Sequence, residues 1–142
     1  MSKFSKFMKA NKIQKQNVVH PVTKSLTDEN GEPILWELKP LSTKENESIR
    51  ESCTVEVPVK GKPNMFRPKL DMEKYQTKMV CASVVYPDLN DKELQDSYGV
   101  MTPEELIKEL VDDPAEYTDL SVFVQKLCGF KTLQEEVDEA KN

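Results

Sequence analysis

The stretch TPEELIKELVDDPAEYTDLSVFVQKLCG, residues 102–129, decides the fold class, because it describes two consecutive helices with their start and stop signals. Each helix is predicted to begin at a capping side chain, Thr102 or Asp113, followed by a proline and then by a glutamate whose carboxylate can reach back to the cap amide. Behind the caps, apolar residues recur at helical spacing until Gly129, a typical helix stop. The stretch therefore predicts a packed pair of helices, and it carries no chemistry of its own.

The length of the chain, 142 residues, fits one domain large enough to build its own core. Because no internal repeat or low-complexity linker marks a second unit, residues 1–142 are predicted to form a single domain. Within it we expect a basic amphipathic segment at 1–17, a hairpin-containing part at 18–70 and a helical part at 71–142. The sequence also lacks an apolar run of the roughly 20 residues that a membrane span needs, so no membrane contact and a cytoplasmic location are expected.

Strand patterns lie in the N-terminal half. Residues near 19–27 and 33–39 are predicted to pair as a β-hairpin, because apolar residues alternate after a turn that contains Gly31. Residues 54–59 and 64–69 resemble a second pair, but their prolines restrict it to an edge hairpin or an ordered loop. Further helices are expected from 42 to about 53, from 71 to about 85 and from 91 to about 98. The predicted fold class is α+β, predominantly α-helical.

The core is predicted from the apolar side of each of these elements. The sole tryptophan is expected to anchor the first hairpin to the helices. The predicted core residues are Trp36, Leu38, Tyr75, Met79, Val80, Leu106, Leu110, Leu120, Val124 and Leu127.

Residues that could support catalysis or bind a metal are few. The three cysteines are far apart and form no Cys-x-x-Cys pair, and the four glycines are scattered singly rather than grouped as in a phosphate loop. The single histidine, His20, precedes Pro21 and is interpreted as an exposed loop residue without a partner for acid–base work. We therefore expect no catalytic residue, no cofactor and no metal.

Charge is distributed unevenly along the chain. Residues 1–17 contain five lysines and no acid, although the net charge of the whole chain is −5. An acidic body argues against nucleic acid as the main partner. The helical pair has the length of a helix-turn-helix motif, but residues 113–124 contain no basic residue that could contact bases or phosphates. A DNA-binding role is therefore disfavoured.

The two termini are the candidate partner-binding segments. A short amphipathic helix is expected to present Phe4, Phe7 and Met8 on a basic background. A last, acidic helix is expected to present Phe130, Leu133 and Val137. Such stripes could contact a helical partner in the helix-in-groove manner. The alternative is that the oppositely charged ends dock on the body or on each other.

Several stretches, taken in order, carry a resemblance to a known family. They are the Phe-rich opening segment, residues 31–41 running into the helix at 42–50, residues 80–89, and residues 98–103 with the helix at 116–120. In this order the chain resembles the XkdN-like family of phage tail assembly chaperones, over nearly its whole length.

The resemblance implies a small cytoplasmic protein that covers the long, partly apolar, helical tape measure protein while tail tube subunits polymerise around it. Such a protein then leaves and is absent from the finished tail. The tape measure protein is the implied partner, with the tail tube protein and a second copy of the chain as further candidates. The alternatives are a generic interaction or adaptor domain without catalytic activity and, below it, a small enzyme or DNA-binding regulator.

Overall fold

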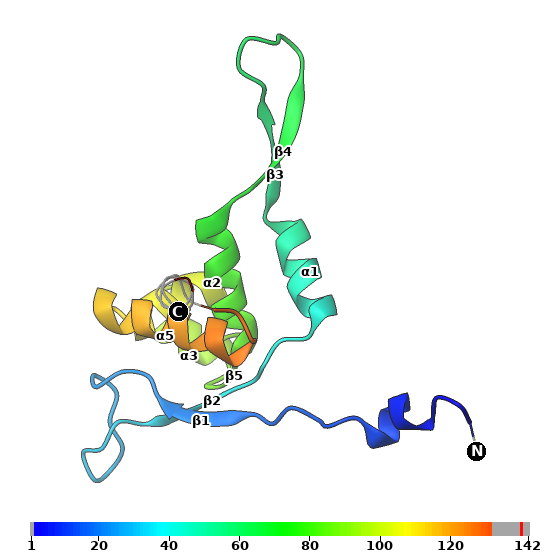
Figure 1. Cartoon of the computed structure of the whole chain (residues 1–142). Coiled ribbons are helices and arrows are strands. Elements are labelled where there is room, and N and C mark those ends of the chain that lie inside the picture. Colours follow the sequence, from blue (N-terminus) through cyan, green and yellow to red (C-terminus); the bar gives the residue numbers. More distant parts are fainter. Residues whose placement is uncertain (1, 132–139, 141–142) are drawn as a thin grey trace.

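The computed structural model describes residues 2–131 and residue 140, and shows a mixed α+β fold. A helical body lies above a small sheet, while a two-stranded ribbon and an N-terminal arm project from it (Figure 1). In chain order the elements are the 3₁₀ turns η1 (Ser5–Phe7) and η2 (Lys9–Asn11), β1 (Val18–Pro21), β2 (Leu35–Leu38), α1 (Thr43–Ser52), β3 (Thr54–Pro58), β4 (Phe66–Leu70), α2 (Met72–Ser83), β5 (Val84–Tyr86), α3 (Lys92–Ser97), α4 (Pro103–Leu110) and α5 (Pro114–Leu127).

The first predicted hairpin is confirmed. Strand β1 pairs antiparallel with β2, with His20 opposite Trp36, and the chain pairs again at Thr27 and Pro33 beyond the strands. The turn between them is held by the Asp28 carboxylate, which accepts hydrogen bonds from two backbone amides, and by a positive φ of 79° at Gly31. This turn chemistry fixes the register that turns Trp36 toward the core.

A third strand, β5, adds to the free edge of β2 and was not predicted. The helix expected to reach residue 85 ends at Ser83, and the following Val-Val-Tyr run pairs with β2. Ser83 and Lys39 fix this junction: the Lys39 amide donates to the Ser83 carbonyl at 2.8 Å, and the Ser83 hydroxyl donates to the Lys39 carbonyl at 2.7 Å. The prediction was wrong because pairing with a distant strand outweighed local helix periodicity.

One contiguous cluster of buried side chains joins the sheet to the helices. Nine of the ten predicted core residues are buried, with exposed fractions from 0% for Leu38 to 7% for Tyr75. The exception is Leu127, which is only partly buried, because it lies in the last turn of α5 at the margin of the cluster. Helix α2 packs against α1, α4 and α5, and it is therefore the central helix of the body.

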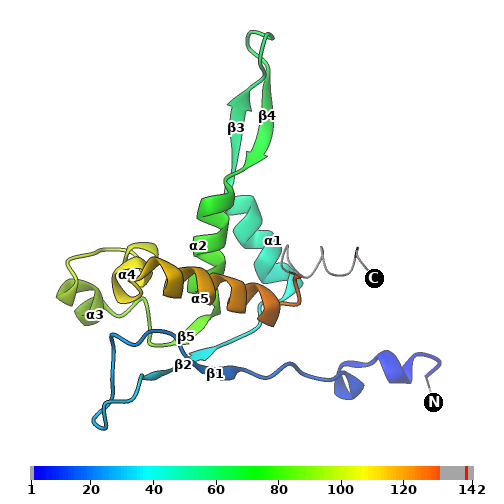
Figure 2. The same cartoon turned by 60° about the vertical axis from the view of Figure 1, so that its left-hand side comes forward.

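The N-terminal segment does not form the amphipathic α-helix expected from its sequence. It forms the two 3₁₀ turns, neither of which has a side-chain cap or a buried residue. A lysine at every third position matches the three-residue period of a 3₁₀ turn better than an α-helical face, and no packing compensates for the missing caps. The segment extends away from the body in both views (Figure 2).

The glutamates that follow the caps of α4 and α5 do not reach back to the cap amides as predicted. Glu105 instead accepts from the Thr102 hydroxyl at 3.1 Å. At α5 the Asp113 carboxylate alone accepts from the first amides, which leaves the Glu116 carboxylate available for the loop after β1. There it accepts from the Thr23 hydroxyl at 2.7 Å and from the Lys24 amide at 2.9 Å. Glu116 thus fastens the hairpin to α5.

Glu116→Ala is expected to lower the free energy of unfolding by about 1–3 kcal/mol, because it removes two hydrogen bonds to a charged acceptor at a half-buried position. Urea unfolding measures this. Glu109→Ala, which removes an exposed carboxylate on α4, is the matched control and should change it by less than about 0.5 kcal/mol. Equal effects of the two substitutions would contradict the role assigned to Glu116.

Candidate partner-binding surfaces

Among the side chains that could bind a metal or react as nucleophiles, the three cysteines make structural contacts. No three His, Cys, Asp or Glu residues among those described lie close enough to hold a metal ion. The three cysteines are unpaired; burial, with a smaller contribution from Glu104, raises the pKa of Cys81 to about 12, so this thiol stays protonated at neutral pH. The Cys128 sulfur accepts a hydrogen bond from the Leu41 amide at 3.4 Å and ties α5 to the chain before α1.

His20 is not the exposed loop residue that the sequence suggested. It lies in β1, is partly buried, and stacks on Phe123 of α5 with ring centroids 4.0 Å apart. The prediction was wrong because the local pattern around Pro21 does not show that β1 faces α5 at this point. The imidazole therefore packs the sheet against a helix.

The arm, residues 2–17, carries large apolar side chains into solvent. The exposed fractions are 60% for Phe4, 83% for Phe7 and 91% for Ile13. Phe4 and Phe7 meet edge to face with ring centroids 6.1 Å apart. At the root of the arm, the Asn17 amide donates to the Glu37 carboxylate at 2.9 Å, which links the arm to β2. The arm thus presents an apolar surface interspersed with lysines.

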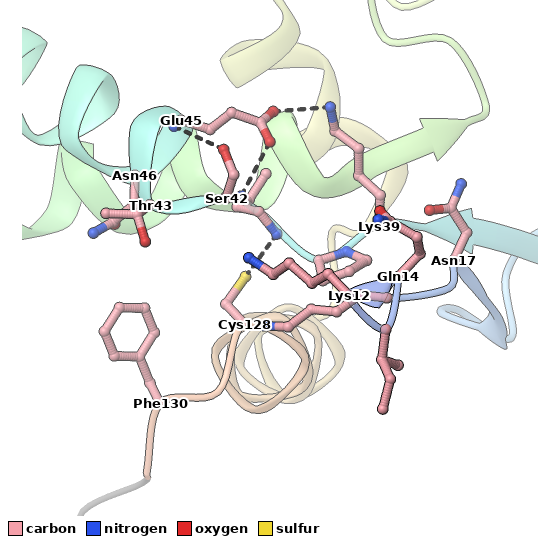
Figure 3. A pocket seen from close by; sticks show the side chains of 14 residues that line it. Lys12, Gln14, Asn17, Lys39, Ser42, Thr43, Glu45, Asn46, Cys128 and Phe130 are labelled. Atoms are coloured by element: carbon pink, nitrogen blue, oxygen red, sulfur yellow. Dashed lines mark hydrogen bonds and ion pairs between the residues drawn. The ribbon is translucent and has the colours of Figure 1, made fainter. Parts of the chain in front are cut away.

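A cleft of about 650 Å³ lies where the root of the arm, the start of α1 and the end of α5 meet (Figure 3). The Phe130 ring projects on the side where Thr43 and Asn46 lie, while Lys12 comes from the arm. Three lysines and one glutamate line the cleft, so its electrostatic potential favours acidic groups. The lining residues are Lys12, Ile13, Gln14, Lys15, Asn17, Lys39, Pro40, Leu41, Ser42, Thr43, Glu45, Asn46, Cys128 and Phe130.

The six predicted partner-binding residues are distributed over separate places. Phe4, Phe7 and Met8 lie on the arm, outside the cleft, whereas Phe130 lines the cleft. Leu133 and Val137 lie outside the described residues. Sequence reasoning missed Ile13, the most exposed large apolar side chain of the arm, because it continues no helical stripe.

An ion pair fixes one wall of the cleft. The Lys39 ammonium lies 2.9 Å from a Glu45 carboxylate oxygen, and the other oxygen accepts from the Ser42 amide as part of a complete capping box. The Lys39 side chain, and then the Ser42 amide, hold the pKa of Glu45 below its ordinary value. Because the folded-state pKa is lowered, the carboxylate stabilises the fold above its ordinary pKa, and this contribution is lost as the pH falls through the folded value.

Lys39→Met is expected to raise the pKa of Glu45 toward its ordinary value, because it removes the largest cause of the shift. An NMR pH titration of the Glu45 side chain measures this. Lys44→Met removes an equal charge from an exposed neighbour and should leave the titration of Glu45 close to wild type. A Glu45 pKa that stays unchanged in the Lys39 variant would contradict the assigned pairing.

Membrane crossing finds no support in the described part of the chain, where every helix is too short or too polar to span a bilayer.

Comparisons with known proteins find relatives over most of the chain. The chain is 27% identical over 137 residues to the phage-like element PBSX protein XkdN of Bacillus subtilis (strain 168), covering 96% of this chain and 91% of that protein. It is 25% identical over 134 residues to YqbN of the same organism, covering 94% and 89%. The crystal structure of YqbN superposes with a TM-score of 0.77 at 21% identity, over 92% of this chain and 99% of that one, which shows a shared fold. The family model for the phage XkdN-like tail assembly chaperone protein matches residues 4–141. The chain therefore belongs to the XkdN-like phage tail assembly chaperones.

Proposed function

We propose that this chaperone binds the tail tape measure protein in the host cytoplasm and keeps it soluble while the tail tube assembles around it. The family assignment supports a role in tail assembly. The observation that carries the finer proposal is the arm, which holds exposed phenylalanines away from the body instead of burying them. Exposed phenylalanines add no stability to the free chain, and exposed apolar patches of this kind mark sites that a partner covers.

The arm fits a long helical partner with apolar stripes. Burying a phenylalanine side chain contributes about 1.5–3 kcal/mol, so the two rings and Met8 together suffice for a specific but reversible contact. The lysines between them keep the free arm soluble and give the contact a dependence on ionic strength. Reversibility suits a chaperone that leaves once the tube is complete.

Phe130 and the following segment form the second proposed contact. Phe130 is 45% exposed and lies at the cleft, directly before the segment that contains Leu133 and Val137. An amphipathic helix of the tape measure protein that enters the cleft would contact Phe130 and Ile13 together. The tail tube protein and a second copy of the chain are further candidate partners, and the same surfaces would serve a generic adaptor domain. Binding to the tape measure protein separates these proposals.

The triple variant Phe4→Ser, Phe7→Ser and Met8→Ser is expected to bind the tape measure protein at least about 10-fold more weakly than wild type, because it removes the apolar surface of the arm. Titration of labelled chaperone with a purified tape measure fragment measures the affinity. The thermal midpoint should not change, since none of these side chains is buried.

Met101→Ser is the matched control, because Met101 is 86% exposed on the body and should not affect binding. An unchanged affinity in the triple variant would remove the arm from the proposed surface. Failure of the wild-type chain to bind the tape measure protein, or to keep it soluble on coexpression, would contradict the proposed function as a whole.

A further inference from the structure

The ribbon formed by β3 and β4 is the second part of the molecule that projects from the body (Figures 1 and 2). At its base, the Asp71 amide donates to the Cys53 carbonyl at 2.8 Å, and Leu70 packs against the core. Beyond this base no residue of either strand is buried. A free two-stranded ribbon in water is marginally stable, so its exposed apolar side chains need a reason.

The pairing register gives the ribbon two different faces. Val55 lies opposite Lys69 and Val57 opposite Arg67, while the Val59 amide donates to the Met65 carbonyl at 2.9 Å and continues the same register. Because side chains alternate along a strand, these odd-numbered residues share one face. That face, here called the valine–cation face, carries Val55 and Val57 on β3 and Val59 directly after it, opposite Lys69 and Arg67 on β4 and Met65 directly before it. Val55 and Met65 are exposed, whereas Val57 and Val59 are half-buried. Leu70 belongs to the opposite face, which meets the core at the base of the ribbon.

Strand addition to the edges of the ribbon is disfavoured. The Val59–Met65 hydrogen bond places 59 and 65 in a hydrogen-bonded pair, so the even-numbered pairs turn their backbone groups outward. Pro58 on β3 and Pro68 on β4 occupy these outward positions and have no N–H to donate. Prolines at edge positions are a known protection against strand pairing. A partner therefore meets the side chains of the ribbon and not its backbone.

We propose that the valine–cation face is a docking surface for an amphipathic helix with acidic residues along one flank of its apolar stripe. Alternate residues of a strand lie about 6.6 Å apart, so the three valines span about 13 Å, or roughly two and a half turns of a helix. Arg67 and Lys69 lie beside the valines on the neighbouring strand, where they would contact the acidic flank of such a helix. Acidic groups are favoured because the ribbon, residues 54–70, carries four basic residues and one acid in a chain of net charge −5.

This proposal concerns a surface that is separate from the arm. Where the proposed function holds, the docking helix belongs to the tape measure protein, so to that extent the inference rests on the proposed function. The surface itself is tested with a synthetic peptide, so that a failure of one proposal leaves the other standing. A nucleic acid could use the cations but would leave the valines uncovered, and it is one outcome of the test.

The experiment is an NMR titration of the full chain with two synthetic helical peptides. Both have the same leucine stripe, and its flank carries glutamates in one and lysines in the other. The methyl signals of Val55, Val57 and Val59 are expected to shift with the glutamate peptide and to stay in place with the lysine peptide. The double variant Arg67→Glu and Lys69→Glu should weaken this binding at least about 10-fold.

A matched control reverses two exposed charges on the body, Lys44→Glu and Lys108→Glu, and should leave the shifts of the valines unchanged. Val57→Thr keeps the β-branched shape, so it should preserve the ribbon while weakening the binding. The proposal is overturned if the valine signals do not move with the glutamate peptide, if both peptides move them equally, or if a short DNA duplex moves them and the glutamate peptide does not.

Discussion

The burial of Trp36 and Leu38 under the helices is the constraint on which the rest of the structure depends. Both side chains point from the central strand β2 to the same side, with 1% and 0% of their surface exposed. On one edge of β2 lies β1, from which the arm continues, and on the other lies β5, which directly follows α2. The strand thus fixes where the arm leaves the body and how α2 is anchored. Substantial apolar surface is removed from water at this one junction.

The sequence predicted the structure best at features that depend only on neighbouring residues, such as helix caps. The capping side chains Ser42, Thr102 and Asp113 each accept from the expected amides, and the positive φ of 90° at Gly129 ends the pair of helices. The burial of Leu106, Leu110, Leu120 and Val124 was predicted correctly from apolar residues at helical spacing. Local patterns could not reveal β5, because its place depends on residues of β2 that lie 46 and 49 positions earlier in the chain. The partner of Glu116 was hidden for the same reason: Thr23 lies 93 residues away.

The candidate surfaces were only partly predictable. The sequence predicted that Phe4 and Phe7 are presented on a lysine-rich segment, and both side chains are exposed. The amphipathic helix predicted for this segment does not form. The meeting of Phe130 with the root of the arm could not be predicted, because it depends on how α5 lies against α1. The valine–cation face needed the register of β3 and β4, since a shift of one residue would have put the valines and the cations on opposite faces.

The molecule therefore combines a packed body with two projections that present apolar and basic side chains, the arm and the ribbon. Such a division lets partner contacts form and break without disturbing the core. Hydrogen exchange of the chain, free and mixed with the tape measure protein as the proposed partner, tests this division most directly. Slower exchange on binding is expected in residues 2–17 and 54–70, with α2 and β2 unchanged. Protection confined to the outer side of α4 and α5, with the arm and the ribbon unchanged, would contradict it.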